Sequence, residues 1–272
     1  MGYATLMVHV DADGSLPQRV KIAAELAARF QAHLIGVAAW APMSVFLAED
    51  ARRDPTPHEV HLRDMKSLLD QRGLEFVAQI GLEPRRVEWR SVLDLPTNVL
   101  AREARAADLV IIGNTRENPD PFRTLDPGGV LMKAGRPVLV VPGTVGALAA
   151  RHVAIAWKDV REARRAVRDA LPFLQRAENV MIVEVSEETG EHAPSGKDVA
   201  AYLTRHGVKV VTERVRVAEV TVTNTLLRLI ENENIDLLVA GAYGHSRVGE
   251  WVFGGITRDL LADLPICCLF SH

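Results

Sequence analysis

The sequence of 272 residues has few aromatic residues, only two cysteines and almost no net charge. Phe, Trp and Tyr together make up 5%, which is little for a protein that stacks nucleobases on aromatic rings. The formal net charge of -3 excludes the bulk positive field that would attract nucleic acid. No apolar run reaches the roughly 18 residues of a membrane-spanning helix. We therefore expect a protein that binds neither nucleic acid nor a membrane.

The two cysteines, Cys267 and Cys268, are adjacent. Neighbouring residues of a strand point to opposite faces, so a disulfide between them is geometrically unfavourable. The pair also lacks the spacing of a zinc site or of a redox C-x-x-C motif. The N-terminus shows no basic segment or cleavage site of a secretory signal. These observations predict a cytoplasmic protein with reduced cysteines and no structural metal.

Hydrophobic residues at 48% and charged residues at 25% are typical of a globular protein, and they are arranged in a repeat. Three segments recur in the same order about 128 residues later. The pairs are Asp108–Gly113 with Asp236–Gly241, Gly128–Leu131 with Gly254–Thr257, and Arg136–Val141 with Leu264–Leu269. We predict a tandem duplication with one domain at 1–143, a linker at 144–150 and a second domain at 151–272.

Each half alternates strand and helix patterns. The strands are apolar on both faces, which is typical of a parallel sheet covered by helices on both sides. Right-handed crossovers then favour two tandem Rossmann-like, or flavodoxin-like, α/β domains, each with a five-stranded parallel sheet of order 3-2-1-4-5. In the second half, the expected helices cover residues 161–176, 196–206, 219–232 and 252–263.

A glycine-rich segment follows the fourth strand of the second half. Ligands of open α/β sheets bind beyond the carboxyl ends of the strands, where the strand order reverses. Glycine lets backbone N–H groups approach a phosphate, and a helix starting near Gly254 would add its N-terminal donors. The spacing Gly241-x2-Gly244-x9-Gly254 resembles the ATP-binding signature of the universal stress protein (UspA) family.

This resemblance covers nearly the whole chain and implies a tandem member of that family. It implies two domains that pair through their last strands, phosphates held in the glycine loop, and adenosine near the ends of the first two strands. The family has no single agreed reaction, and its members act as binders or regulators in stress survival more often than as enzymes. We therefore expect ATP, with Mg²⁺ accompanying it, as a regulatory ligand. A homodimer and protein partners are left open, and no catalytic residue is nominated.

The expected site of the second half includes two departures from the family pattern. The family has Ser or Thr after the third glycine, where this chain has Gly255, with Thr257 two residues later. Lys158 stands where the family has an Asp near the adenosine. A lysine can meet a phosphate or fill the site with its own charge. The predicted nucleotide-binding residues are Trp157, Lys158, Gly241, Gly244, His245, Gly254, Gly255 and Thr257.

The first half has the complementary pattern. Asp11 ends its first strand, within a loop that matches the family's Asp-containing loop. After Gly113, however, Arg116 stands where the second glycine belongs, and the two prolines that follow offer no N–H to a phosphate. We interpret Asp11, Gly113 and Arg116 as the remnant of a site that has lost its phosphate cradle.

Three functions remain open from the sequence. The first is a nucleotide-binding stress-response protein, and the second is a nucleotide-free interaction protein of the same family with a degenerate site. The third is a slow ATP hydrolase, which would need a metal ligand and a residue that orients water. Bound nucleotide separates the first from the second, and Mg²⁺-dependent turnover separates the third from both.

A further segment is rich in arginine. Arg161, Arg164, Arg165 and Arg168 recur at helical spacing beside Glu162 and Asp169. A helix with such a mixture of charges usually turns it toward solvent. We therefore expect a solvated helix face rather than a nucleic-acid site.

Overall fold

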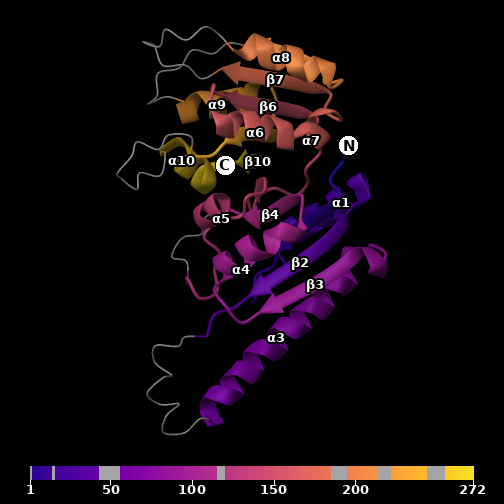
Figure 1. The fold of residues 1–272 in the computed structure, drawn as a ribbon, viewed down its shortest axis with the longest axis vertical. Helices are drawn as coiled ribbons and strands as arrows, with labels where there is room; N and C mark the ends of the chain where they lie inside the picture. Colours follow the sequence, from indigo (N-terminus) through magenta and orange to yellow (C-terminus); the bar gives the residue numbers. More distant parts are fainter. Residues whose placement is uncertain are drawn as a thin grey trace. The chain divides into compact units, whose positions relative to one another are not determined.

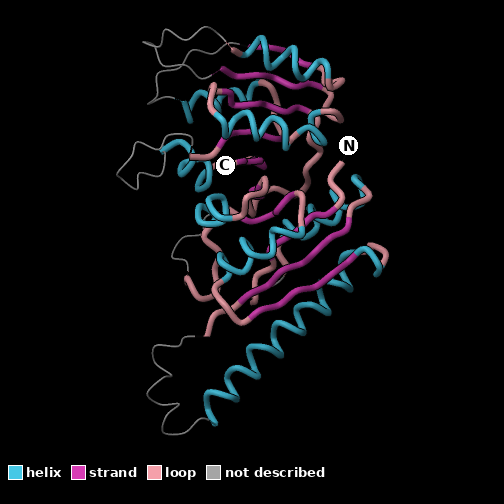
Figure 2. Tube along the Cα trace, viewed as in Figure 1, coloured by secondary structure: helices cyan, strands magenta, loops and turns pink. Residues whose placement is uncertain are grey.

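The computed structural model describes residues 2–13, 16–42, 56–114, 120–184, 195–213, 222–243 and 255–272. The chain forms two compact units (Figure 1). The first unit is Tyr3–Ala134, and the second is Gly135–His272 together with Gly2. Strands and helices alternate along both units, as Figure 2 shows. The boundary between the two units follows from how compactly each unit packs. The domain limits derived from the sequence repeat stay a prediction.

The first unit is a four-stranded parallel sheet with the order β3-β2-β1-β4. Helix α1 packs with α3 and helix α4 packs with α5, as right-handed crossovers in both directions from β1 require. The strands are β1 (Thr5–His9), β2 (His33–Ala39), β3 (Val87–Val92) and β4 (Leu109–Gly113). The helices are α1 (Gln18–Phe30), α3 (Thr56–Ile80), α4 (Pro96–Glu103) and α5 (Pro127–Lys133), with single 3-10 turns η1 (Pro84–Arg86) and η2 (Ala104–Ala106).

The second unit contains the order β10-β9-β6-β7-β8, which is the predicted 3-2-1-4-5 read from the other edge. A further strand, β5, pairs antiparallel with β10, so that Val140 lies opposite Cys268. The strands are β5 (Val138–Val141), β6 (His152–Trp157), β7 (Asn179–Glu184), β8 (Val210–Glu213), β9 (Leu237–Gly241) and β10 (Cys267–Ser271). The helices are α6 (Arg161–Asp169), α7 (Leu171–Leu174), α8 (Gly196–Arg205), α9 (Val222–Asn232) and α10 (Gly255–Asp263).

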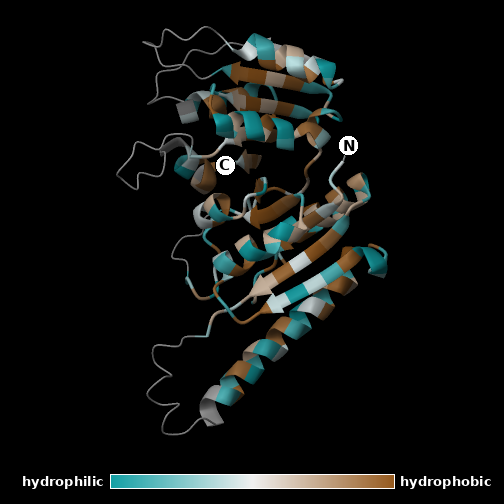
Figure 3. Cartoon of the chain, in the orientation of Figure 1, coloured by the Kyte–Doolittle hydropathy of each residue, from teal (hydrophilic) through white to brown (hydrophobic). Residues whose placement is uncertain are grey.

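The central strands of both units are buried on both faces, which confirms the α/β prediction. Leu6, Met7 and Val8 follow one another in β1 and are all fully buried. Leu238 and Val239 of β9 are equally inaccessible. In Figure 3 the central strands are coloured as hydrophobic. Because consecutive side chains point to opposite faces, such runs require helices on both sides of the sheet.

A repeated aspartate joins the fourth strand of each half to the start of the first. The Asp108 carboxylate accepts hydrogen bonds from the two backbone N–H groups at the start of β1, at 2.7 and 2.9 Å. Asp236 does the same at the start of β6, at 2.9 and 3.1 Å. The two carboxylates occupy equivalent places, so the sequence repeat is also a structural repeat.

One predicted helix is shorter than expected. The segment predicted as a single helix over 161–176 is divided into α6 and α7. Pro172 lies in the first turn of α7, where its missing N–H breaks the hydrogen-bond ladder, and it disfavours helical backbone in the residue before it. The helix predicted near 252–263 is observed as α10 from Gly255 onward.

The adjacent cysteines are free and buried. Burial raises the pKa of the Cys267 thiol to about 12. The pKa of the Cys268 thiol is raised by burial as well. Both therefore act as small apolar residues of β10 rather than as thiolates. Among the helices that the structure describes, none is long and apolar enough to cross a membrane.

Candidate functional site

Strands β6 and β9 lie side by side at the point of the second unit where the strand order reverses. Ala156 is opposite Ala240, so Trp157 and Lys158 at the end of β6 lie next to Gly241 and the residues that follow it. Parallel strands end at the same edge of the sheet, and this edge is where ligands of α/β sheets bind. The structure thus brings together three residues that the sequence analysis selected from distant positions.

Gly241 is required by packing. A Cβ atom added to it would lie 2.6 Å from the backbone nitrogen of Ala163 and 2.8 Å from the carbonyl carbon of Glu162. Both atoms belong to the first turn of α6, which therefore lies directly against the end of β9. A side chain at this position would clash with the backbone of α6 unless the helix shifted, whether or not a ligand is bound.

The residues after Gly241 form the first part of the predicted loop. Tyr243 has a φ of 57°, a left-handed conformation that is uncommon for a residue with a side chain. Its N–H points to Oγ1 of Thr257 at 3.5 Å, and Thr257 is 7% exposed. The Tyr243 and His272 rings lie edge to face, with their centres 6.4 Å apart. His272 Nδ1 in turn lies 3.1 Å from the carbonyl oxygen of Ala242.

The rest of the predicted loop is described only in part. Gly255 is the first residue of α10. Gly244, His245 and Gly254 lie outside the described residues. The Thr257 hydroxyl lies beside the backbone of the loop, so the structure gives this side chain a local contact in addition to the predicted one with phosphate.

Trp157 is fixed beside the start of α8. Its indole is 3% exposed, and Nε1 donates a hydrogen bond of 2.9 Å to Oγ of Ser195. The backbone N–H groups of Ser195 and Gly196 donate to Oε1 of Glu184, at 2.9 and 3.2 Å. Glu184 ends β7, so its carboxylate acts as a helix cap from a neighbouring strand. Glu184 and Ser195 escaped the sequence analysis because their partners lie 11 or more residues away.

A buried acid lies below Gly241. Glu162, in the first turn of α6, is 3% exposed and accepts a hydrogen bond from Arg161. Burial alone would raise the pKa of Glu162, but this hydrogen bond and the nearby positive charge outweigh it, so the pKa is lowered. The carboxylate is therefore ionised at neutral pH.

The corresponding edge of the first unit has an internal ion pair. Nη2 of Arg19 on α1 lies 2.8 Å from Oδ2 of Asp11, which is 7% exposed. Nε of Arg19 donates to the carbonyl oxygen of His9 at 2.8 Å. The arginine also lies below Gly113, where an added Cβ would be 3.0 Å from Nη1. Asp11, predicted as a remnant of the site, is thus neutralised by the protein itself.

The helix that follows β4 is capped by its own carboxylate. The Asp126 side chain accepts hydrogen bonds from the N–H groups of Gly128 and Gly129, at 3.1 and 3.0 Å. In the repeat these two glycines correspond to Gly254 and Gly255, the predicted phosphate donors. A carboxylate therefore occupies the place that an anionic ligand would take in the first half.

The end of β2 is closed as well. The guanidinium of Arg123 lies 4.1 Å from the centre of the Trp40 ring, and its Nη1 is 3.4 Å from Oδ2 of Asp13. The backbone N–H of Ala41 donates to the carbonyl oxygen of Phe122 at 2.8 Å. Segment 120–124 is thereby held over the edge of the sheet. Arg116 of the same connection lies outside the described residues.

Comparison with known proteins assigns the chain. The model of the universal stress protein family matches residues 2–142 and 159–270. The chain belongs to the universal stress protein family. A universal stress protein structure from Archaeoglobus fulgidus DSM 4304 matches with a TM-score of 0.63 at 13% identity, over 97% of this chain and 94% of that one.

A second structure, of a functionally unknown protein from Pseudomonas aeruginosa PAO1, has a TM-score of 0.56 at 16% identity. The match covers 98% of this chain and 92% of that one. At these identities the likeness shows a shared tandem fold. No curated protein matches the sequence significantly.

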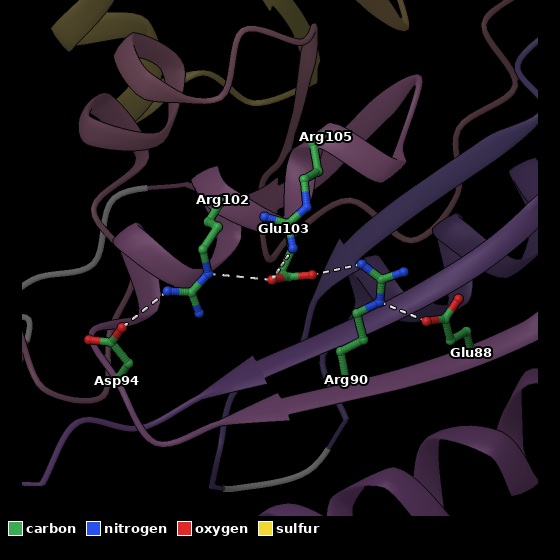
Figure 4. A network of polar contacts seen from close by, with 6 residues as sticks. All are labelled: Glu88, Arg90, Asp94, Arg102, Glu103 and Arg105. Carbon is green, nitrogen blue, oxygen red and sulfur yellow. Dashed lines mark hydrogen bonds and ion pairs between the residues drawn. The ribbon is translucent and has the colours of Figure 1, made fainter.

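Away from the carboxyl ends of its strands, this universal stress protein has a charged network on its first unit (Figure 4). Glu103 of α4 accepts a hydrogen bond from Arg90 of β3 at 2.7 Å and contacts Arg102 and Arg105 at 3.5 Å. Arg90 also bonds Glu88 at 2.7 Å. Burial would raise the pKa of Glu103, but the arginines lower it overall. The network joins edge strand β3 to α4.

The described residues contain no group of three His, Cys, Asp or Glu side chains arranged to hold a metal ion. At the carboxyl ends of their strands, the two halves of this family member differ in their charged and polar contacts. In the first, Arg19 pairs with Asp11, Arg123 stacks on Trp40, and Asp126 caps α5. In the second, a lysine follows β6 and a glycine opens the helix after β9.

Proposed function

We propose that this universal stress protein is a cytoplasmic stress-response regulator that binds ATP, and that the second half holds the nucleotide. The observation that carries this proposal is the Asp126 cap of α5, for which the sequence before α10 has no counterpart. Asp126 occupies the N–H groups of Gly128 and Gly129 in the first half. The residue aligned with Asp126 is Val252, which has no oxygen with which to cap Gly254 and Gly255. We therefore expect the N–H groups at the start of α10 to be available to a phosphate.

The other predicted residues supply the charge and shape that such a ligand needs. Lys158 follows β6 beside Gly241 and offers an ammonium to the phosphates, together with any accompanying Mg²⁺. Gly244 and His245 would contribute donors from the loop, and Thr257 would hold the loop start. The free, buried cysteines are consistent with the reducing conditions of the cytoplasm.

A nucleotide-free interaction protein is the second candidate, and one observation favours it. The contacts of Gly241 with α6 explain this glycine by packing alone. A glycine loop can therefore persist in the second half after its ligand has been lost. The two candidates differ in a property that is simple to measure.

The first experiment is to denature freshly purified protein and assay the supernatant for adenine nucleotides by chromatography and mass spectrometry. Calorimetric titration with ATP, with and without Mg²⁺, follows, and adenosine serves as the ligand without phosphates. The proposal expects ATP to bind and adenosine to bind far more weakly. Silence in both assays would support the nucleotide-free candidate.

Lys158→Met tests the role of the lysine in the same titration. Loss of one charge-assisted contact to phosphate should weaken ATP binding by about tenfold. Lys197→Met, at an exposed position of α8, removes the same charge and should leave the affinity unchanged. Equal affinities for both variants would place the phosphates away from Lys158.

A further inference from the structure

Acidic and basic residues are interspersed in the sequence of helix α6, but their side chains lie on different faces of the helix. Glu162 is 3% exposed, and Asp169 is half-buried and accepts a hydrogen bond of 2.8 Å from Oγ of Ser271. The side chains of Arg161 and Arg164 are 67% and 59% exposed, and those of Arg165 and Arg168 are exposed too. The acids therefore face inward and the four arginines face outward, and α6 is coloured mostly as hydrophilic in Figure 3.

The outer face of α6, defined by Arg161, Arg164, Arg165 and Arg168, already contacts oxygen acceptors. Nη2 and Nε of Arg164 both reach Oδ1 of Asp159, at 2.5 and 3.1 Å. Nη1 of Arg165 donates to the backbone carbonyl oxygen of His272 at 2.8 Å. Planar guanidinium groups held in this way suit carboxylates, which they bind through two parallel N–H groups.

We propose that the outer face of α6 is a docking surface for an acidic polypeptide segment of a partner protein. The helical rise places Arg161 and Arg168 about 10 Å apart along the axis. An extended segment of about three residues spans the same length, because a strand rises about 3.3 Å per residue. A short run of Asp and Glu therefore matches the arginines in both charge and length. Arginine is also among the residues that contribute most at protein interfaces.

The surroundings of α6 favour a short acidic segment over a nucleic acid. Exposed acids lie on either side of the arginines in the sequence, Asp159 before α6 and Glu178 after α7, with side chains 50% and 58% exposed. Four arginines could neutralise at most about four phosphates of a nucleic acid, which gives only a small electrostatic contribution to binding. The negative net charge of the whole chain also opposes a long polyanion.

The test measures binding of a fluorescein-labelled octaglutamate peptide to the full chain by fluorescence anisotropy, at low and at physiological salt. The wild-type protein should bind, and more weakly at higher salt. The variant R165E/R168E should bind at least about tenfold more weakly. The control R63E/R85E changes the net charge equally at exposed positions of the first unit and should stay within about twofold of wild type.

Two further variants keep the outcome decisive. Circular dichroism and thermal melting establish that R165E/R168E is folded, and R165Q/R168Q repeats the test without adding negative charge. The proposal is overturned by an absence of peptide binding at low salt, or by equal binding of wild type and R165E/R168E. Tighter binding of a DNA duplex or of phosphatidylserine vesicles than of the peptide, lost in the same variants, would replace the protein partner by a nucleic acid or a membrane. Neither result bears on the ATP proposal, which is tested separately.

Discussion

At the carboxyl ends of the strands, the two halves carry charges of opposite sign in corresponding places. In the first half an acid, Asp11, lies in the loop after the first strand, and a base, Arg19, lies below the glycine that ends the fourth strand. In the second half Lys158 occupies the loop and Glu162 lies below Gly241. The opposite end of the sheet has not changed, because Asp108 and Asp236 make the same hydrogen bonds. A duplicated fold can thus keep its frame while its sites diverge.

The largest effect is expected from breaking the ion pair of the first half. Arg19→Met leaves Asp11 buried without its guanidinium, which should lower the free energy of unfolding by about 3–5 kcal/mol. Adding Asp11→Asn should restore part of the loss. Urea denaturation measures the change, and hydrogen exchange assigns it to a unit. Arg164→Met removes an exposed pair of the second half and should cost at most about 1 kcal/mol. Equal costs would contradict the burial argument.

The glycines that end β4 and β9 sharpen the comparison. Gly241→Ala brings a Cβ against the backbone of α6, which cannot move without shifting the helix, so we expect a loss of about 1–3 kcal/mol. Gly113→Ala meets only the tip of the Arg19 side chain and should cost less than about 1 kcal/mol. The difference in urea midpoint between the two variants checks this. A larger loss for Gly113→Ala would reverse the assignment of the two contacts.

Exchanging the helix caps tests whether they separate the two halves. Val252→Asp places a carboxylate at the position aligned with Asp126 and should weaken ATP binding at least about tenfold in the calorimetric titration. Val252→Ala is the neutral control and should bind as wild type does. In the first half Asp126→Ala removes the cap and should destabilise the protein by about 1 kcal/mol. Full ATP affinity in Val252→Asp would mean that the phosphates do not bind at the start of α10.

The smallest effects concern pH, where Glu103 of the first half and Asp169 of the second should respond in opposite directions. Arginine contacts lower the pKa of Glu103, so its contribution to stability is present at neutral pH and lost as the pH falls through the folded-state pKa. Burial raises the pKa of Asp169, so its contribution is present at acid pH and lost as the pH rises through the folded-state pKa. Urea midpoints of E103Q and D169N between pH 3 and 7 should differ from wild type in opposite ways. Parallel curves would contradict one pKa direction.

The fold could be predicted from the sequence because parallel strands need apolar residues on both faces, and β1 and β9 have them. The repeat indicated two such domains, and right-handed crossovers favoured the strand order. Pro172 shows the limit of periodicity alone, since its apolar neighbours continue the helical pattern that its ring interrupts.

The site could be predicted only in part. Trp157, Lys158 and Gly241 meet because strand ends meet, which topology dictates. The pairing of Arg19 with Asp11 depends on the angle between α1 and β1, and the contact of Arg123 with Trp40 depends on a long connection. The N-cap of α5 could have been predicted from the sequence, because Asp126 stands before a proline and two glycines.

The place of β5 bears on how the protein is made. This strand belongs by sequence to the first half of the duplication, yet it pairs with β10 in the second unit. On the ribosome, residues 138–141 emerge well over a hundred residues before Cys267–Ser271, their antiparallel partner. During that interval the apolar strand β5 lacks its partner β10, and an unpaired strand edge can pair with another nascent chain. Translation speed across the second half thus sets how long β5 remains without its partner β10.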